Sequence, residues 1–405
     1  MTDGVLLVLN TATGADSEHL LAEVAASHPI ALITPHWPIW ERAHLSDSEV
    51  ADPLDLKDLR AAVARLAARH HIDGVLTWDE RLLVPAAHVA ADLGLPGNSS
   101  ATAVACRNKA IARAVWSAAG LPQAASERAS SLAGAQAAAK RIGFPVVIKP
   151  VAHREGLGVI KATTADELPA AYAYATRHAL DQGREGCGVL VEEYLDGPEI
   201  AVHCVTARGI TTPVALARKT TSPQPWFPIL GYSVTADDPL LAQVAPLAEA
   251  ALDALGIANG ITHVQIAMTA SGPRLIDVNA RLGDHLVPHL VFEATGIDLP
   301  AAAAAIAQGH EPDLTPNWAR TATLAFHTAP RPARLIRAKT REDLARLPWL
   351  DRLVWLHEPG DELGTLTNGD PGDLRLYYLV VTGDDRDQCR ERITEATALL
   401  DVEIA

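Results

Sequence analysis

Short apolar runs alternate with helical segments over the first eighty residues, and this alternation restricts the fold more than any other feature. The runs at 5–10, 29–34 and 74–77 have the length of buried strands. The segments 17–27 and 55–71 repeat apolar residues at helical spacing. Strands that alternate with helices usually pair in parallel, because each helix carries the chain back across the sheet. We therefore predict a parallel, doubly wound α/β sheet at the N-terminus.

Turn-forming residues and changes in composition divide the chain into three predicted domains. A chain of 405 residues is too long for one ordinary core. The turn LPGN ends the first domain, which we place at residues 1–98. The second domain is placed at 99–309 and contains a small α+β module at about 124–196. Pro-rich loops then lead to short strands and a closing helix, which predict a C-terminal α+β domain at 310–405.

Two further segments are predicted as helices. The segment 105–119 has helical spacing, and we expect one uninterrupted helix there. The alanine-rich tract 300–307 is also predicted as a helix rather than a low-complexity linker, because alanine has the highest helix propensity.

The composition argues against several classes of partner. A net charge of −15 without a cluster of Lys and Arg predicts no nucleic-acid partner. The apolar run at 5–9 is too short for a signal peptide or a membrane span, so we expect a cytoplasmic protein with no membrane partner. The four cysteines form no CxxC pair, which argues against a cysteine-based zinc site and a disulfide framework. An anionic nucleotide would need a few lysines, backbone amides and a metal ion.

Lys149, in FPVVIKP, ends an apolar strand and is the first candidate ligand of an anion. A buried ammonium needs an anionic partner, and a phosphate would serve, although a strand-end lysine can also point into solvent. The following loop contains Gly156 and Gly158, whose amides could approach phosphate oxygens closely. The loop matches neither GxxxxGK[ST] nor GxGxxG, so an ordinary glycine hairpin remains the alternative. Lys109 alone reads as a surface helix lysine.

The segment 189–199, VLVEEYLDGPE, joins an apolar strand to an acidic pair, a tight turn and a further acid. A carbonyl and an amide of such a hinge can pair with the edge of adenine. A carboxylate at its far end can accept hydrogen bonds from ribose hydroxyls. An acidic hairpin with a solvated tip is the alternative.

Two polar strands, THVQI and LIDVNARLG, form the strongest cluster. Alternate side chains of a strand share one face, so Asp277, Asn279 and Arg281 are expected to project together. The turn at 270–273 would bring Gln265 beside them on an antiparallel neighbour. Oxygen ligands of this kind suit Mg²⁺ that bridges nucleotide phosphates, and Arg281 could stabilise a transferred phosphoryl group. A solvent-facing hairpin is the alternative.

In order and spacing these segments resemble the ATP-grasp superfamily, particularly its amino-acid-ligase and biotin-carboxylase-like branches. The resemblance covers nearly the whole chain and is most specific in VVIKP, VEEYLDGPE and THVQIAMTASGPRLIDVNARLGD. It implies a pre-ATP-grasp N-terminal domain, a central two-part ATP-grasp domain and a C-terminal α+β lobe. It also implies ATP and Mg²⁺ as cofactors, and a homodimer is frequent in the superfamily.

The resemblance assigns a role to each residue that matches a superfamily motif. Two phosphate-facing lysines, a glycine loop, an adenine hinge and a ribose acid make up the implied ATP-binding set: Lys109, Lys149, Gly156, Gly158, Glu192, Glu193, Tyr194, Leu195 and Glu199. The implied metal ligands are Gln265, Asp277 and Asn279, and the implied catalytic residues are Arg281 and Lys219. The superfamily usually has glutamate at the positions of Gln265 and Asp277, so one ligand charge is lost and one ligand is shorter.

The implied reaction is the joining of a carboxylate and an amine through an acyl-phosphate, with amino acids as the expected small-molecule substrates. A carboxylase of the biotin-carboxylase type is the runner-up, and the neutral Gln265 also prompts a non-catalytic, nucleotide-binding alternative. Asp284, His285 and His289 follow the strand that carries Asp277 and Asn279. They are expected to line the substrate pocket, with a capping or core role as the alternative for the two histidines. His153 and His203 are candidate proton acceptors.

Overall fold

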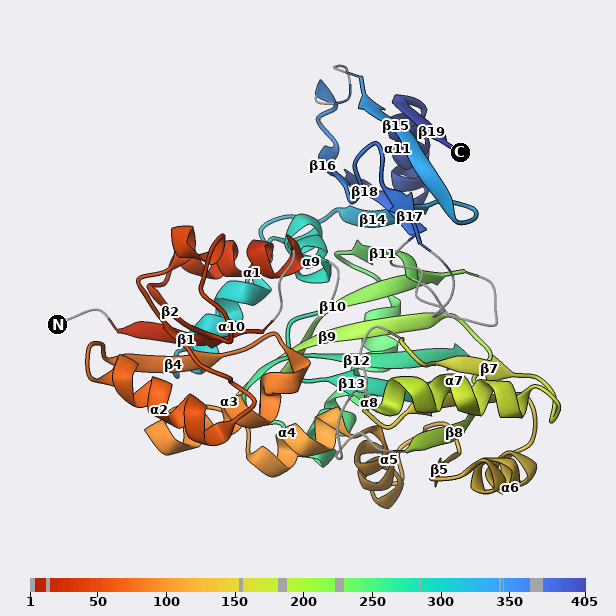
Figure 1. Ribbon diagram of the computed structural model, residues 1–405, viewed down its shortest axis with the longest axis horizontal. Coiled ribbons are helices and arrows are strands. Elements are labelled where there is room, and N and C mark those ends of the chain that lie inside the picture. The colour runs from red at the N-terminus through yellow and green to blue at the C-terminus, as the bar shows by residue number, and fades with distance from the viewer. Residues whose placement is uncertain are drawn as a thin grey trace.

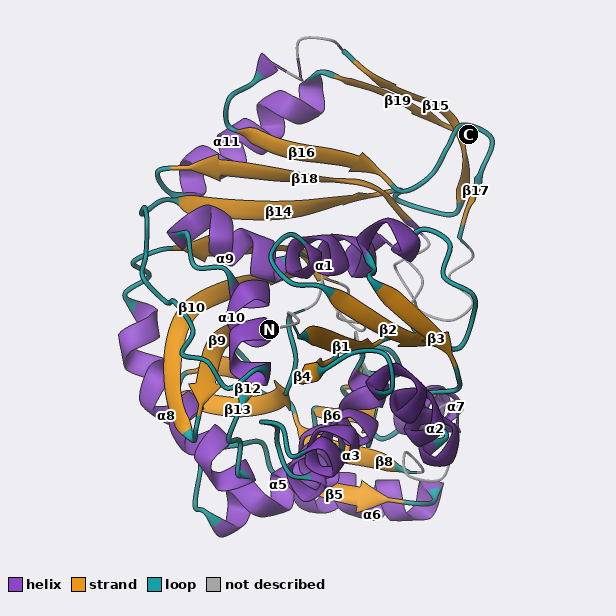
Figure 2. Cartoon of the chain, turned by 90° about the vertical axis from the view of Figure 1, so that its left-hand side faces the viewer, coloured by secondary structure: helices purple, strands orange, loops and turns teal. Residues whose placement is uncertain are grey.

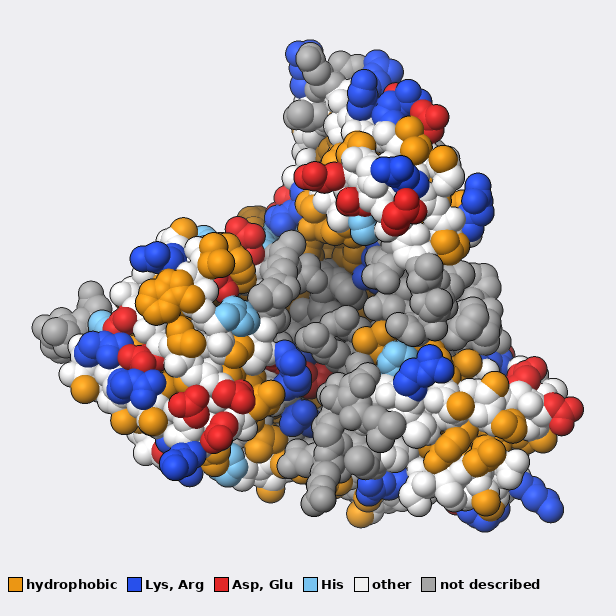
Figure 3. All heavy atoms as spheres, in the orientation of Figure 1, with side chains coloured by type: hydrophobic (Ala, Val, Ile, Leu, Met, Phe, Trp, Pro, Cys, Tyr) orange, Lys and Arg blue, Asp and Glu red, His pale blue; other side chains and the backbone are white. Residues whose placement is uncertain are grey.

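The computed structural model describes residues 4–11, 15–152, 156–180, 188–222, 229–283, 286–341, 344, 346–364 and 374–405. It shows an N-terminal lobe, a central body and a C-terminal lobe, and the C-terminal lobe projects away from the other two (Figures 1 and 3). The domain boundaries expected at 98 and 309 remain predictions.

The N-terminal lobe is built on a parallel sheet with the strand order β3-β2-β1-β4. Alternate side chains of β1 enter two cores: Leu6 and Val8 face one, whereas Leu7 and Leu9 face the other. Burial on both faces explains why these strands appear as continuous apolar runs. The predicted doubly wound α/β fold is therefore confirmed. The strands are β1 (Val5–Leu9), β2 (Ile30–Thr34), β3 (Asp47–Val50) and β4 (Ile72–Leu76).

Helices cover both faces of this sheet. The helices α1 and α10 pack against Leu6 and Val8, while α2 and α3 pack on the opposite face. The alanine-rich tract is thus a helix, as predicted, and it returns from the central part of the chain to cover the N-terminal sheet (Figure 2). The four helices are α1 (Ala15–Ala25), α2 (Leu56–Ala67), α3 (Leu83–Leu93) and α10 (Leu299–Ala307).

The central body and the C-terminal lobe share one antiparallel sheet, ordered β13-β12-β9-β10-β11-β14-β18-β16. The pairing of β11 with β14 carries the sheet across the predicted boundary at 309. Its strands are β9 (Glu199–Ala207), β10 (Ile210–Thr221), β11 (Ile229–Thr235), β12 (Gly260–Thr269), β13 (Gly272–Asn279), β14 (Thr321–Thr328), β16 (Leu350–Trp355) and β18 (Arg375–Gly383). Helix α8 (Leu240–Leu255) packs on the central strands, and α9 (Val287–Thr295) precedes α10.

A separate antiparallel sheet forms the small module predicted within 124–196. Its order is β5-β8-β6-β7, and its core includes Val146, Ile148 and Val191. The module consists of β5 (Ser126–Ala129), α6 (Leu132–Ile142), β6 (Val146–Pro150), β7 (Ile160–Ala162), α7 (Leu168–Leu180) and β8 (Val189–Glu193). The C-terminal lobe adds a further sheet and a helix: β15 (Ala333–Thr340), β17 (Glu362–Leu363), β19 (Leu400–Ile404) and α11 (Arg386–Ala398).

The uninterrupted helix expected at 105–119 is wrong, because the chain forms two helices there. Asn108 leaves helical geometry, and its side chain accepts hydrogen bonds from the amides of Ala110 and Ile111. An N-cap of this kind contributes about 1 kcal/mol to helix stability. The break places Lys109 at the first position of the second helix. The two helices are α4 (Ser100–Arg107) and α5 (Lys109–Ala118).

Within the described residues, no single helix has the length and apolar composition that a membrane span requires. Only α9 and α10 taken together pass that test, and they are bent by 107° relative to each other.

Candidate active site

A pocket between the small module and the central sheet collects most of the predicted site residues. These members line it: Lys109, Lys149, Gly156, Glu192, Glu193, Tyr194, Leu195, Glu199, Lys219, Gln265, Asp277 and Asn279. Among the described candidates, Gly158, Arg281, His203 and His289 do not contribute to this lining. Residues separated by more than a hundred positions therefore meet at one site, as their proposed joint role requires.

Lys149 and Glu192 form the first buried ion pair of the pocket. They lie diagonally across the antiparallel strands β6 and β8, and Lys149 Nζ is 2.6 Å from Glu192 Oε2. Both side chains are at most 6% exposed. The carboxylate of Glu192 is therefore part of the pocket, so this residue contributes its side chain as well as a place in the expected hinge. The anionic partner expected for Lys149 is present within the protein itself.

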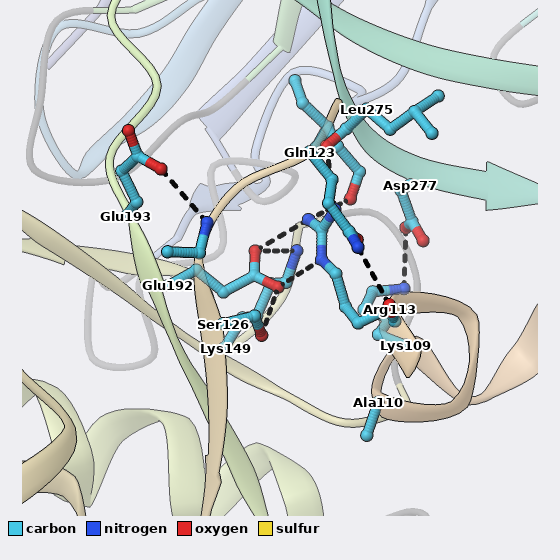
Figure 4. A network of polar contacts seen from close by, with 12 residues as sticks. Lys109, Ala110, Arg113, Gln123, Ser126, Lys149, Glu192, Glu193, Leu275 and Asp277 are labelled. Carbon is cyan, nitrogen blue, oxygen red and sulfur yellow. Dashed lines mark hydrogen bonds and ion pairs between the residues drawn. The ribbon is translucent and has the colours of Figure 1, made fainter. Parts of the chain in front are cut away.

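Arg113 completes this pair and was missed by the sequence analysis. Its guanidinium donates to both carboxylate oxygens of Glu192 at 2.7 and 3.0 Å (Figure 4). It also donates to the backbone carbonyls of Leu275 and Ile276 at 2.8 and 2.7 Å. One buried arginine thus connects α5, β8 and β13. A signal existed in the sequence, since Lys109, Arg113 and the apolar positions 112 and 116 follow the spacing of one helix face.

The electrostatic balance keeps these groups ionised. Burial alone would raise the pKa of Glu192, but Arg113 and Lys149 lower it to about 2. Burial is also the largest influence on Lys149 and lowers its pKa, only partly offset by Glu192. The pair therefore remains ionised only while its partners stay close.

Acid unfolding provides a test of this balance. A carboxyl whose folded pKa is about 2, against an ordinary 4.5, stabilises the fold fully above pH 4.5. That contribution is lost as the pH falls towards 2. The difference in free energy of unfolding between the wild type and Glu192→Gln should therefore narrow over this interval, as measured by urea titration. A difference that stayed constant with pH would contradict the ionised pair.

Lys109 and Asp277 form a second buried pair, with Nζ 2.7 Å from Oδ2. Burial would lower the pKa of Lys109, yet Asp277 and Glu80 raise it. Burial would likewise raise the pKa of Asp277, yet Lys109 and Lys149 lower it. Among the described side chains, Lys109, Arg113 and Lys149 thus supply three positive charges against the carboxylates of Glu192 and Asp277. Glu80 is a third carboxylate that acts on Lys109, so these cations are already balanced by carboxylates, and a polyanionic ligand would compete with them for the cationic groups.

The three residues predicted as metal ligands lie together on two neighbouring strands. Gln265 on β12 pairs in register with Asp277 on β13, and Asn279 follows two positions later on the same face. All three side chains line the pocket. One carboxylate and two amide oxygens fit Mg²⁺, which accepts oxygen ligands and retains several waters. A cation at Asp277 together with a phosphate at Lys109 would give each member of the existing ion pair a new partner of opposite charge.

Arg281 does not extend this row, and the expectation that it shares the strand face was wrong. Strand β13 ends at Asn279, and the chain bends before Arg281. Its guanidinium donates to the Leu282 carbonyl at 2.9 Å and lies 3.4 Å from Glu80 of the N-terminal lobe. The alternation rule fails here because it applies only while the backbone stays extended.

Glu80 is the second buried residue that the sequence analysis missed. It lies in a short 3-10 helix, Glu80–Leu82, directly after strand β4 of the N-terminal sheet, and it is 8% exposed. It acts electrostatically on Lys109 and contacts Arg281. Acidic residues at the carboxyl end of a parallel strand are a known signal for a site, because ligands bind at that edge.

The expected adenine hinge has its backbone partly engaged. The Glu193 amide donates to Ala125 at 2.8 Å, and the Tyr194 amide donates to Pro145 at 3.3 Å. The Glu193 side chain pairs with Arg274 at 2.9 Å. The amides of Glu193 and Tyr194 are therefore already used within the protein.

Two further pairs border the pocket. The Lys219 ammonium lies 2.7 Å from the Glu199 carboxylate, so the predicted catalytic lysine and ribose acid contact each other. The Lys161 ammonium lies 3.5 Å from the centre of the Tyr194 ring, a cation–π contact.

The two loop glycines have different environments. Gly156 lines the pocket, and nothing lies within 4 Å of the place where a Cβ would stand. Gly158 has a φ of 75°, and a Cβ there would come within 2.7 Å of Pro150 and 2.9 Å of His178. The need for glycine at 158 is therefore explained by packing and backbone conformation. His153, Asp284 and His285, as well as the loop positions 223–227, lie outside the described residues. His289 is described and lies apart from this pocket.

A pocket with buried cations beside an oxygen-rich strand pair, set between a small antiparallel module and a larger sheet, defines a nucleotide-binding protein of the ATP-grasp class. Two family models match the chain: an ATP-grasp N-terminal domain at residues 32–97 and an ATP-grasp domain at residues 142–289. The chain belongs to the ATP-grasp superfamily.

Similar proteins cover most of the chain. An uncharacterized protein, y4rH, of Sinorhizobium fredii is 28% identical over 100% of this chain and 84% of its own length. A phosphoribosylamine–glycine ligase of Streptomyces coelicolor is 28% identical over 88% of this chain and 86% of its own length. The solved structure of an L-amino acid ligase from Bacillus licheniformis is 19% identical, with a TM-score of 0.82 and 100% of both chains covered. That structural likeness supports the fold.

Proposed function

We propose that the protein is an ATP-dependent carboxylate–amine ligase that releases ADP and phosphate. The observation that carries the proposal is the buried charge arrangement in which Lys109, Lys149 and Arg113 meet Glu192 and Asp277. Burial of charged side chains is unfavourable for folding. Apolar residues of similar size in the same positions often give a fold that is equally stable or more stable. A pocket with this many ionised groups is therefore best explained by a charged ligand.

The described residues divide the work of binding ATP. The hinge at 193–195 would hold adenine, and Glu199 would accept hydrogen bonds from ribose. Lys109 and Lys149 would face the phosphates, with Gln265, Asp277 and Asn279 as the Mg²⁺ ligands. Bound Mg²⁺ would neutralise charge on the phosphates during phosphoryl transfer.

The reaction needs positioning and charge neutralisation rather than a protein nucleophile. A substrate carboxylate oxygen attacks the γ-phosphorus of ATP, the bond to the bridging oxygen breaks, and ADP leaves. The amine then attacks the acyl carbon, loses a proton and expels phosphate. Arg281 and Lys219 are the residues that we propose to stabilise the transferred group.

The substrates that we propose are amino acids or similar small amines and carboxylates. Support comes from the relatives, whose names specify glycine ligation and L-amino acid ligation. Lys219 lies on strand β10 and lines the pocket, and its ammonium already contacts a carboxylate, that of Glu199. A substrate carboxylate could take the place of this contact without a change of charge.

Product analysis tests the proposal. The protein is incubated with ATP, Mg²⁺ and pools of amino acids, while ADP release is followed and products are identified by mass spectrometry. We expect ADP release that depends on both a carboxylate and an amine, together with an amide product. Turnover dependent on bicarbonate would support the carboxylase alternative. Nucleotide binding without turnover in any pool would support the non-catalytic alternative.

The neutral metal ligand gives a specific prediction. Gln265→Glu restores a negative charge opposite Asp277, and we expect the Mg²⁺ concentration for half-maximal nucleotide binding to fall about tenfold, because charge count tunes affinity. Binding of a fluorescent ATP analogue across a Mg²⁺ titration measures this effect. Glu249→Gln, a charge change on α8 away from the pocket lining, serves as the control. An unchanged Mg²⁺ requirement in Gln265→Glu would place residue 265 outside the metal's coordination.

A further inference from the structure

A cluster of two histidines and two carboxylates joins the three lobes at a distance from the nucleotide pocket. His19 and Glu23 lie one turn apart on α1, and therefore on the same face of that helix. His289 on α9 and Asp351 on β16 complete the cluster. Figures 1 and 2 both show α1 beside α9, and their apolar residues share one core.

Three nitrogen and oxygen atoms converge in this cluster. His19 Nε2 lies 2.9 Å from Glu23 Oε1, and His289 Nδ1 lies 3.8 Å from the same oxygen. The potential ligand atoms of His19, Glu23 and His289 all lie within 4.8 Å of one another. In a tetrahedral zinc site with metal–ligand bonds of about 2.05 Å, neighbouring ligand atoms lie about 3.3 Å apart. This distance falls between the 2.9 Å and 3.8 Å separations observed here.

Two of these polar groups are buried without a hydrogen-bond partner. His19 Nε2 and Glu23 Oε2 are both inaccessible to solvent and have no such partner within the described structure. The contact between His19 and Glu23 is close, but it lacks the geometry of a hydrogen bond. Buried polar atoms of this kind destabilise a fold unless a ligand satisfies them.

We propose that His19 Nε2, the Glu23 carboxylate and His289 Nδ1 bind one Zn²⁺ ion. Two imidazoles and one carboxylate are a ligand set that zinc accepts, whereas Mg²⁺ prefers oxygen ligands. The side chains of His19 and Glu23 retain 18% and 26% exposure, so the cluster lies near the protein surface.

The surroundings of His289 fit the outer shell of a metal site. Its other ring nitrogen, Nε2, lies 2.9 Å from Asp351 Oδ2, and Asp351 also accepts from Arg352 at 2.7 Å. A histidine that binds metal through one nitrogen usually donates from the other to a carboxylate, which fixes the ring orientation. Arg352 also lies 3.0 Å from His289 Nε2, on the side of the ring opposite the proposed metal ligand Nδ1. Bound zinc would connect the N-terminal lobe to α9 directly.

Metal titration of the full-length protein tests this proposal. After chelator treatment and dialysis, Zn²⁺ is titrated in competition with a chromophoric chelator, with excess Mg²⁺ present to occupy oxygen-rich sites. We expect one Zn²⁺ per chain. We expect His19→Gln and Glu23→Gln to weaken binding at least about 100-fold, and Asp351→Asn to weaken it about 10–100-fold. His310→Gln, on the exposed surface away from the cluster, should bind as the wild type does.

Co²⁺ provides a second readout that does not depend on activity. The wild-type complex should show the visible absorption of tetrahedral Co²⁺ without a thiolate charge-transfer band, and His19→Gln should lose it. Circular dichroism confirms that each variant is folded. Failure of the wild type to bind Zn²⁺, or equal binding by His19→Gln, would overturn the proposal. A hydrogen-bonded His289 held between Glu23 and Asp351 would then account for the cluster.

Discussion

Replacement of Arg281 by alanine is expected to lower kcat about 10²–10³-fold while ADP and ATP binding change little. The proposed ligase reaction develops charge on the transferred phosphoryl group, and a guanidinium that acts mainly in the transition state contributes to kcat rather than to binding. Arg281 is 5% exposed and follows the metal strand by two residues, with Glu80 as its partner. Rates of ADP release and calorimetric nucleotide affinities measure the two quantities separately.

Two matched variants make this result interpretable. Lys149→Ala should weaken nucleotide binding itself, because this lysine lines the pocket. Glu80→Gln removes the charged partner of Arg281 and keeps the arginine, so it separates loss of the guanidinium from loss of the ion pair. Equal losses of affinity and turnover in Arg281→Ala would contradict a transition-state role.

Removal of the Arg113 guanidinium should produce the largest loss of stability among the site variants. Arg113→Ala leaves Glu192 buried with one of its two cationic partners and leaves the carbonyls of Leu275 and Ile276 without their donor. Breaking a buried pair from one side costs about 3–5 kcal/mol, because the remaining charge loses its compensation. The free energy of unfolding from urea titration measures this loss.

Arg274→Ala is the matched control for Arg113. Both terminal guanidinium nitrogens of Arg274 also donate to a carboxylate, that of Glu193, but these two side chains are 25% and 35% exposed. Water can replace the lost contact there, so a cost of about 1 kcal/mol or less is expected. Similar destabilisation by the two substitutions would show that burial does not govern the contribution of Arg113.

The sequence predicted the parts of the fold where apolar periodicity is strong. The continuous run of β1 and the alternation around Asp277 and Asn279 were sufficient to place those strands and their faces. Strands β3 and β5 were missed because DSEV and SERA contain little apolar surface and lie at sheet edges, where burial does not constrain the sequence.

The pairing of charges could not be predicted from the sequence. Arg113 and Glu192 are 79 residues apart, and their contact depends on how α5 packs against the small module. The helix face that carries Arg113 was readable, but its partner was not. Likewise, Arg281 and Glu80 are 201 residues apart, and their contact could not be predicted from the pattern around β13. Local patterns say which side chains share a face, and long-range packing decides what they meet.

The shared antiparallel sheet has a mechanical consequence. Because β11 is hydrogen-bonded to β14, the C-terminal lobe cannot rotate as a rigid body against the central strands without breaking a backbone ladder. The small module has its own sheet and meets the pocket through side chains such as Lys149 and Glu192. Any opening that admits a nucleotide should therefore be a displacement of the small module, with the C-terminal lobe and central sheet moving as one stiff unit.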